Sequence, residues 1–253
     1  EYDASIASFL SPTEPLRMQA YGVQTLRYGE NPHQRSTLYN WNPGDGPLGG
    51  DLLQGRPLSY NNLLDLYSAW RAAVSFDKPT VVIVKHLSPC GIASGAELSA
   101  AFQPALASDP ISAFGGVIAT NRSFDVKVAS LLDDLFVECI AAPGFDESAR
   151  TELRRRKNCR LLHMPGTGSE PRPELRSIMA GVLLQDRDLG DPAERAADWQ
   201  VVTDRQPSEE EWRSLRFSWT ACQHVKSNAI VLSQGEATVG IGGGQPNRVD
   251  CVR

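Results

Sequence analysis

The hydrophobic and polar positions of residues 60–84 predict a helix that is followed by a buried strand. Asn61 and Asn62, which can cap a helix N-terminus, precede apolar residues at helical spacing. These apolar residues are Leu63, Leu66, Tyr67, Trp70 and Val74. After Lys78 and Pro79 comes the β-branched run 80–84, which no charge interrupts. Such a run is typical of a strand buried on both faces.

Two more short apolar runs predict further strands of the same sheet. Val117 to Ala119 follow the pair Gly115 and Gly116, and Ile140 to Ala142 end at Pro143. Helical patterns separate these runs. The first part of the chain is therefore expected to form α/β layers, α/β/α in order, around a largely buried sheet.

The pattern changes after residue 163. Residues 164–198 are rich in Pro, Gly and charge, and we interpret them as an insertion or linker within a first unit, residues 1–200. A second unit, residues 201–253, begins with Ser208 and Glu211, a capping-box pair ahead of apolar positions at helical spacing that run to Val225. Residues 229–232 and 238–241 then predict two adjacent strands.

Composition narrows the class of protein. Of 253 residues, 41% are hydrophobic and 22% charged, which indicates a globular fold, and the formal net charge of -5 argues against a nucleic-acid surface. The basic run Arg154 to Lys157 is expected on a solvated helix face. No apolar run reaches the roughly 18 residues of a membrane span, so we expect a cytoplasmic protein that does not bind membranes. The five scattered cysteines predict reduced core thiols.

The pair Lys85 and His86 is the strongest chemical signal. It lies at the carboxyl end of the predicted strand 80–84, and ligands of α/β sheets bind beyond the carboxyl ends of strands. A structural role, with a salt-bridged Lys and a loop-capping His, is equally consistent with the pattern. Pro89 and Cys90 are similar to the Pro-Cys of zinc deaminases, but the second Cys and the His-x-Glu of that motif are absent, so no metal is expected.

Three weaker constellations accompany this pair, and the first two have an ordinary turn as their alternative. The first is the polar segment 27–34, whose Arg27 can grip a phosphate bidentately. In the second, 112–116, paired glycines let backbone amides approach a ligand. The third combines 226–228 with the glycine-rich loop 242–244.

Taken in order, these segments resemble the formyltransferase domain of the bifunctional aminoimidazole carboxamide ribonucleotide (AICAR) formyltransferase and inosinate cyclohydrolase family. The resemblance covers the chain from end to end. The matching stretches are LRYGENPHQ (26–34), LSYNNLLDLYSAW (58–70), VKHLSPCGIA (84–93), DPISAFGGVIA (109–119), ECIAAPGF (138–145), KSNAIVL (226–232) and GIGGGQPNRVDCVR (240–253).

The resemblance implies a fold and an assembly. The family's domain consists of two subdomains similar to cytidine deaminase without its zinc, and it forms homodimers with active sites between subunits. This chain would hold the first subdomain and the beginning of the second. The cyclohydrolase domain and the final stretch of the formyltransferase domain are expected to be missing from it.

The resemblance also implies roles for residues. The reaction would transfer a formyl group from 10-formyltetrahydrofolate to the 5-amino group of AICAR, with His86 as proton acceptor and Lys85 stabilising the oxyanion, without a metal. The residues implied in substrate binding are Arg27, Tyr28, Asn62, Phe114, Gly115, Glu138 and Asn228. Those implied in folate binding are Arg248 and Val249.

Two other classes remain open from the sequence. The chain is also consistent with a non-catalytic nucleotide-binding subunit, or with one half of a split formyltransferase that a second polypeptide completes. A metal-dependent deaminase is the other alternative. The loop Gln245 to Asn247 differs from the commoner family members, in which another residue replaces Pro246.

Overall fold

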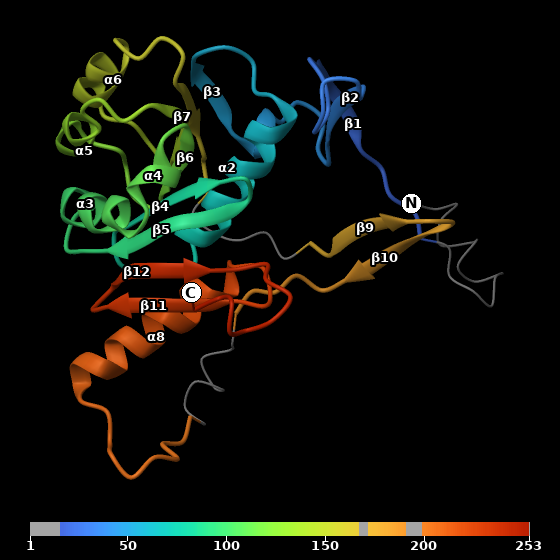
Figure 1. Cartoon of the computed structure of the whole chain (residues 1–253). Coiled ribbons are helices and arrows are strands. Elements are labelled where there is room, and N and C mark those ends of the chain that lie inside the picture. The colour runs from blue at the N-terminus through green and yellow to red at the C-terminus, as the bar shows by residue number, and fades with distance from the viewer. Residues whose placement is uncertain (1–15, 167–171, 191–198, 253) are drawn as a thin grey trace.

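The fold is described here from a computed structural model, which covers residues 16–166, 172–190 and 199–252. Within these ranges the main sheet contains eight strands (Figure 1). They are β3 (Asp51–Gln54), β4 (Thr80–Lys85), β5 (Ser88–Ser94), β6 (Gly116–Thr120), β7 (Val137–Ala142), β8 (Arg160–His163), β11 (Ile230–Gln234) and β12 (Ala237–Gly242). Their spatial order is β11-β12-β5-β4-β6-β7-β8-β3. β6 is parallel to β7 and β7 to β8, whereas the other neighbours are antiparallel.

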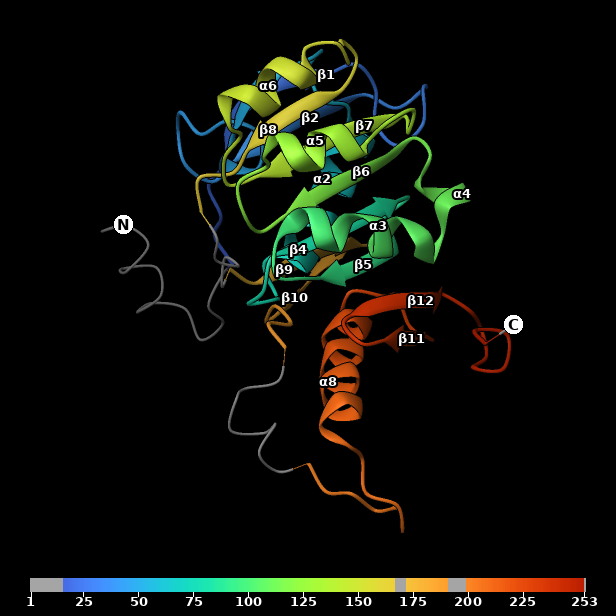
Figure 2. The ribbon, with the colours of Figure 1, turned by 90° about the vertical axis from the view of Figure 1, so that its left-hand side faces the viewer.

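Helices cover both faces of this sheet. One face carries α3 (Leu98–Ser108), α5 (Val126–Leu131) and α6 (Glu147–Leu153), which lie toward the viewer in Figure 2. The other face carries α2 (Tyr60–Ala73) and, beside it, α8 (Glu209–Gln223). The layered α/β fold is confirmed. The division into two cytidine-deaminase-like subdomains, at about residue 200, stays a prediction.

The β-branched run of β4 contributes to both cores. Val81 and Ile83 pack with α3, α5 and α6, whereas Val82 and Val84 pack with α2. Successive residues of a strand point to opposite faces, and helices cover both faces of this strand. All four side chains are therefore buried. The continuous apolar run in the sequence follows directly from the two covered faces.

The predicted helix and strand of residues 60–84 are confirmed, but the helix cap is different. The N-cap is Ser59, whose hydroxyl accepts a hydrogen bond from the Asn62 amide, while the Asn62 side chain accepts one from Ser59 N. Asn61 and Asn62 therefore lie inside the helix rather than before it. The capping-box logic applies here with Asn in the place of Glu.

β5 was not expected from the sequence. Pro89 lies within it, and a proline normally argues against a strand because it cannot donate to the ladder. Here the register shifts between Ile83 and Val84, so that Pro89 lies opposite Val84 at the irregularity. This bulge lets the strand continue past the proline.

The second predicted unit is confirmed in its elements. Ser208 and Glu211 form the capping box of α8, and β11 and β12 follow as an antiparallel pair. Thr238 fastens this pair to the main sheet, because its hydroxyl accepts from Ile92 N at 2.9 Å and donates to Ile92 O. β11 and β12 thus extend the sheet that the first part of the chain builds.

Two small hairpins lie outside the main sheet. β1 (Tyr21–Leu26) pairs with β2 (Ser36–Asn40), and the 3-10 turn Pro47–Gly49 follows them. β9 (Glu174–Ile178) pairs with β10 (Gly181–Gln185), and this hairpin projects from the body (Figure 1). Residues 174–185, expected to be linker, are therefore ordered as strands. The short apolar run Val182 to Leu184 within a Pro- and Gly-rich segment was the local signal for β10.

The basic run Arg154 to Lys157 does not occupy a helix face. α6 ends at Leu153, and Arg154 is its C-cap. Three members of the run are exposed, and the partly buried Arg156 donates from Nη1 to Leu135 O at 2.7 Å. The prediction of solvation holds for most of the run, but the prediction of a helix is wrong because the chain turns at this point.

Candidate active site

The topology brings three of the predicted site segments to one edge of the sheet. β4 runs antiparallel to β6, so Lys85 at the end of β4 lies near Gly115, which precedes β6. β7 is parallel to β6, and Gly116 lies opposite Val137, so Glu138, the second residue of β7, lies at the same edge. The edge thus collects a lysine, a glycine turn and a carboxylate that lie far apart in the sequence.

His86 and Leu87 form the tight turn between β4 and β5. Lys85 pairs with Ser88, which leaves these two residues as the connection. Their φ angles are 53° and 67°. Positive φ at both central positions belongs to the hairpin turns that usually contain Asn-Gly or Gly-Gly. Two residues with side chains in this conformation carry a backbone cost, which is common at functional sites.

Two side chains of helix α2 hold this turn through hydrogen bonds. The Leu87 amide donates to Asp65 Oδ1 at 2.7 Å, and the Ser68 hydroxyl donates to Leu87 O at 2.9 Å. Both polar groups of the Leu87 backbone are therefore bonded to side chains of one helix. Burial raises the pKa of the Asp65 carboxyl, although the Leu87 amide and the His86 ring act in the opposite direction.

Lys85 and His86 line a cavity of about 230 Å³. The Lys85 ammonium group donates to Phe114 O at 2.8 Å, and this bond ties the end of β4 to the glycine turn. Asp109 also lines the cavity, and hydrogen bonds from Ser112 lower the pKa of its carboxyl. The cavity therefore offers a cation, an imidazole and an ionised carboxylate around one space.

Asn62 and Glu138, both predicted in substrate binding, contact each other directly. The Asn62 amide group donates to Glu138 Oε2 at 2.8 Å, and Arg160 Nη1 lies 3.6 Å from the same oxygen. This contact joins the first turn of α2 to β7. Arg160 Nε is buried and has no hydrogen-bond partner among the residues that the structure describes.

The glycine-rich loop approaches the cavity from the second unit. Val225 and Gly243 line the space together with Lys85. Asn228 holds the loop, since its side-chain amide donates to Gln245 O and Pro246 O at 3.1 Å each. A Cβ at Gly243 would lie 2.4 Å from Val225 Cγ1, so glycine is the residue that fits at this position of the loop.

The remaining predicted residues lie farther from the cavity. Arg27 and Tyr28 begin the turn between β1 and β2, where the Arg27 guanidinium group lies 5.6 Å from the Tyr28 ring centroid. Their loop meets α2 where Asn61 donates to Glu30 O at 3.4 Å. Arg248 and Val249 are exposed in the turn after the glycine loop and do not line the cavity. Their predicted roles are not tested by these contacts.

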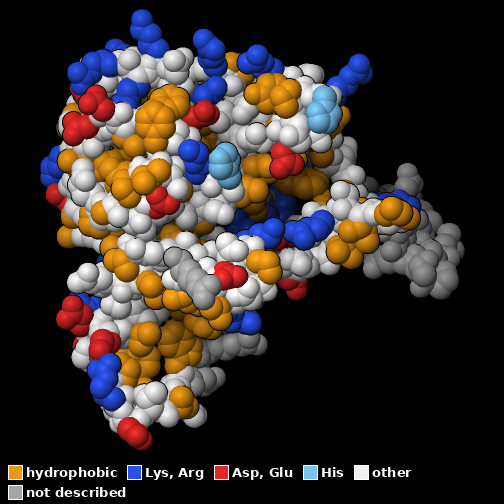
Figure 3. All heavy atoms as spheres, in the orientation of Figure 1, with side chains coloured by type: hydrophobic (Ala, Val, Ile, Leu, Met, Phe, Trp, Pro, Cys, Tyr) orange, Lys and Arg blue, Asp and Glu red, His pale blue; other side chains and the backbone are white. Residues whose placement is uncertain are grey.

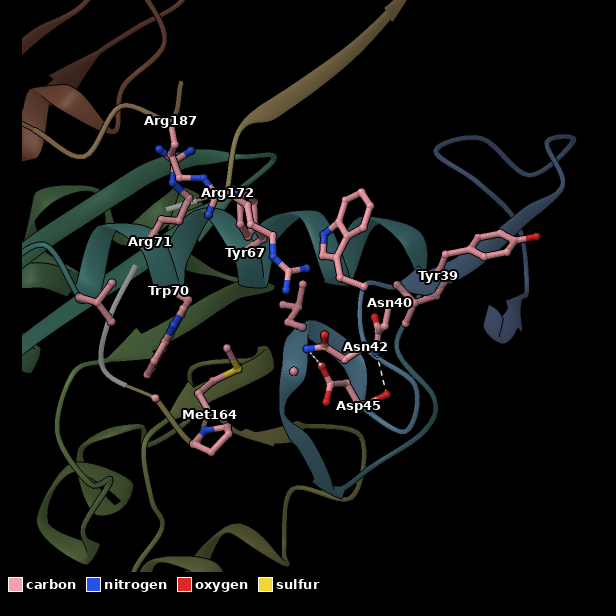
Figure 4. A pocket seen from close by; sticks show the side chains of 17 residues that line it. Tyr39, Asn40, Asn42, Asp45, Tyr67, Trp70, Arg71, Met164, Arg172 and Arg187 are labelled. Atoms are coloured by element: carbon pink, nitrogen blue, oxygen red, sulfur yellow. Dashed lines mark hydrogen bonds between the residues drawn. The ribbon is translucent and has the colours of Figure 1, made fainter. Parts of the chain in front are cut away.

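A larger cavity, of about 420 Å³, lies elsewhere on α2 (Figure 4). Arg71, Arg172 and Arg187 surround the Tyr67 side of this cavity, and Glu174 at the start of β9 lies 3.0 Å from Arg71 Nη1. None of the predicted catalytic or substrate-binding residues lines it. The smaller cavity remains the better candidate because it combines a cation, an imidazole and a carboxylate.

Three residues at the site, Asp65, Ser68 and Asp109, were not among the predicted ones. Asp65 and Ser68 follow Asn62 at intervals of three, so all three lie near one face of α2. That polar spacing on an otherwise apolar helix was the available signal. Asp109 was visible as a possible N-cap before Pro110 and indeed caps the short helix α4 (Pro110–Ala113).

The cysteines agree with the prediction of reduced thiols. Cys90, Cys139, Cys159 and Cys251 are buried, Cys222 is partly buried, and all five are free. Burial raises the pKa of the Cys90 thiol to about 11, so this cavity residue is not a thiolate at neutral pH. Across the described ranges no three His, Cys, Asp or Glu side chains gather to hold a metal, and the absence of a metal stays a prediction.

Comparison with known proteins identifies the family. Residues 1–253 match a family model described as "AICARFT/IMPCHase bienzyme". The chain belongs to this family. Bifunctional purine biosynthesis proteins PurH are similar to it: 44% identity in Anaeromyxobacter sp. (strain K) over 100% of the chain, 44% in Synechococcus elongatus over 100%, and 43% in Nostoc punctiforme over 98%.

The chain spans about half the length of these curated relatives, 52%, 50% and 48% respectively. The match to the bienzyme family confirms the resemblance seen in the motifs. No helix in the described ranges is long and apolar enough to span a membrane.

Proposed function

We propose that this chain forms the AICAR formyltransferase part of its family's bienzyme and transfers a formyl group from 10-formyltetrahydrofolate to the 5-amino group of AICAR. The product would be the formylated nucleotide FAICAR, an intermediate on the way to inosinate. The observation that carries the proposal is the shared cavity of Lys85, His86 and Asp109, at the edge where Glu138 and Asn62 meet.

The chemistry requires a proton acceptor. The amine of AICAR is conjugated to a ring that bears a carboxamide, so its lone pair is a poor nucleophile. His86 accepts its proton while the amine nitrogen forms a bond to the formyl carbon. A positioned general base contributes about 100- to 10,000-fold to such a step. The exposed His86 lines the cavity, which supports this assignment.

Lys85 stabilises the charge that develops on the formyl oxygen. When the bond from the formyl carbon to folate N10 breaks, that nitrogen takes up a proton, and the Lys85 ammonium group and the protonated His86 are the available donors. Charge stabilisation of this kind is worth about 3 to 4 kcal/mol. The bond to Phe114 O holds the ammonium group in place.

The other residues are assigned to binding. Arg27 and Tyr28 hold the nucleotide phosphate, and Arg248 and Val249 contact the folate. The imidazole carboxamide is held by Asn62, Phe114, Gly115, Glu138 and Asn228. The contact between Asn62 and Glu138 supports this assignment, because it presents a carboxylate and an amide side by side.

A double-mutant cycle tests the catalytic assignment in an active preparation of the enzyme that contains this chain. His86→Ala is expected to lower kcat at least about a hundredfold and to leave nucleotide Kd within a few-fold. Lys85→Met is expected to lower turnover and affinity together. The double mutant should lose less than the product of the single losses, because residues that act as one unit are non-additive. Near-normal turnover of His86→Ala would overturn the assignment.

The phosphate assignment has its own experiment. Arg27→Ala is expected to weaken binding of AICAR at least tenfold while the nucleoside without phosphate binds almost as before, because a charge-assisted contact matters only where the phosphate is present. Calorimetry with both ligands measures the two losses. Equal losses would mean that Arg27 shapes its loop and does not hold the phosphate.

The working form is proposed to be a cytoplasmic homodimer, or a complex with a complementing chain. The support is the exposed apolar surface of the projecting hairpin and of α8 (Figure 3). Light scattering at micromolar concentrations measures the assembly. A monomer at every concentration would contradict it.

A further inference from the structure

The turn that carries His86 is held by two side chains to which no role has been assigned. Asp65 accepts a hydrogen bond from Leu87 N at 2.7 Å, and Ser68 donates one to Leu87 O at 2.9 Å. Both come from α2, which is packed into the core through Leu66 and Ala69, each with no exposed surface. The helix thus provides a rigid base under an exposed turn.

The turn needs such support. His86 and Leu87 both have positive φ, a conformation that residues other than glycine, asparagine and aspartate rarely adopt. Leu87 is 48% exposed, so packing of its side chain supplies little of the energy that keeps this conformation. The hydrogen bonds to Leu87 N and Leu87 O are the contacts that favour this conformation.

Charge distinguishes Asp65 from an ordinary helix residue. The charges of His86 and Glu138 both act on the Asp65 carboxyl, but burial has the largest effect on its pKa and raises it. The other charged groups around the His86 ring are Lys85 on β4 and Asp109 before α4, both of which line the cavity with it. Asp65 is partly buried, and desolvation of a carboxylate carries a cost that its hydrogen bond from Leu87 N offsets in part. This geometry ties the carboxylate to the turn that carries His86.

We propose that Asp65 is a positioning residue of the formyl transfer, which fixes the His86 ring toward the cavity by holding the Leu87 amide, with Ser68 as the second point of attachment. This inference rests on the proposed function of His86. It assigns a role to two further residues. Asp65 and Ser68, which together form a clamp on Leu87, set the geometry of the base, whereas other groups determine substrate affinity.

Kinetics separate this role from a structural one. Asp65→Ala is expected to lower kcat about 30- to 100-fold and to change nucleotide Kd less than threefold, because misplacement of a catalytic group acts on the transition state. Asp65→Asn keeps an oxygen acceptor and should restore part of the loss. Ser68→Ala should cost about threefold to tenfold. Asp134→Asn, at an exposed site beyond α5, is the matched control and should leave kcat unchanged.

Stability gives a readout with the opposite sign. Because burial raises the pKa of Asp65, the folded state disfavours its charged form, and Asp65→Asn should keep or raise the Tm at pH 7 while it lowers kcat. As the pH falls through the raised pKa of Asp65 in the folded state toward its ordinary pKa of 3.8, the folded protein takes up the proton first. The wild type should therefore gain stability relative to Asp65→Asn over this range. A purely structural Asp65 would give a lower Tm together with lower activity.

Hydrogen exchange tests the clamp on this chain without any activity assay. Exchange of the Leu87 amide is expected to become at least tenfold faster in Asp65→Ala, whereas amides in the middle of β4 keep their rates. Faster exchange together with lower kcat supports the proposal. Unchanged exchange, or a kcat within twofold of wild type, overturns it. If His86→Ala is fully active while the clamp is present, the proposed function fails first and the kinetic role of Asp65 fails with it.

Discussion

Two hairpins of this protein, β4–β5 and β9–β10, have turns of the same length in opposite surroundings. Each turn consists of two residues, His86 and Leu87 in one and Met179 and Ala180 in the other. Leu87 and Ala180 have nearly the same positive φ, 67° and 60°. The strands of β4–β5 are buried on both faces, whereas every residue of β10 is exposed. Both residues of the first turn have positive φ, whereas in the second only Ala180 does. A two-residue turn therefore belongs to the candidate site in one place and to a projecting arm, β9–β10, in the other.

The surroundings of each hairpin account for its different role. An isolated two-stranded hairpin is marginally stable in water. β4–β5 gains its stability from two cores and a clamp, and its turn can hold a strained histidine. β9–β10 has Leu175, Val182 and Leu184 on one face, and Val182 and Leu184 are each 51% exposed. Its apolar residues favour a partner.

The largest expected difference between the hairpins is in stability. Ile83→Ala in β4 should lower the free energy of unfolding by about 2 to 5 kcal/mol, because it leaves a cavity in a packed core. Leu183→Ala in β10, where the side chain is 54% exposed, should cost less than about 0.5 kcal/mol. Denaturant unfolding of dilute samples measures both. Equal losses would show that the arm is packed in solution.

For self-association, in contrast to stability, substitutions in the arm β9–β10 should have the larger effect. Leu184→Ser is expected to weaken self-association at least tenfold, about 1.4 kcal/mol, because it places a polar group on the apolar face of the arm. Val202→Ser, at an exposed apolar residue outside the arm, is the control. Sedimentation over a range of concentrations gives the dissociation constants. Equal association of the two variants would remove the arm from the interface.

Glycine substitutions compare the turns directly. Leu87→Gly and Ala180→Gly should each change stability by about 1 kcal/mol or less, since relief of positive φ is offset by the greater freedom of glycine in the unfolded chain. Only Leu87→Gly should lower turnover, by about threefold to tenfold, because a looser turn misplaces His86. Turnover losses of the same size in both variants would break the comparison.

The smallest effect is expected where the arm joins the body. Glu174 at the base of β9 pairs with Arg71 of α2 at 3.0 Å, and both side chains are partly exposed. Glu174→Gln should cost about 0.5 kcal/mol or less and speed amide exchange in β9 and β10. High salt should mimic the substitution. Glu97→Gln, which removes a fully exposed pair with Lys127, is the control and should leave the arm unchanged.

Much of the fold could be predicted from local patterns. The apolar run of β4, the helical spacing of α2 and the capping box of α8 are properties of neighbouring residues, so the sequence displays them. The arm β9–β10 and the strand β5 were harder. A proline and a glycine-rich context argue against strands locally, and only pairing with another segment overrides that preference.

The candidates for chemistry were visible in the sequence alone: Lys85 and His86 after a buried strand, and the family motifs around them. The tertiary structure decided which of these residues meet. The register of β4, β6 and β7 brings Lys85, Gly115 and Glu138 to one edge, and α2 places Asp65 under the turn. The physical reason is that helix and strand patterns arise from interactions between near neighbours. Contacts such as that of Asn62 with Glu138, 76 residues apart in the chain, exist only after the sheet has assembled.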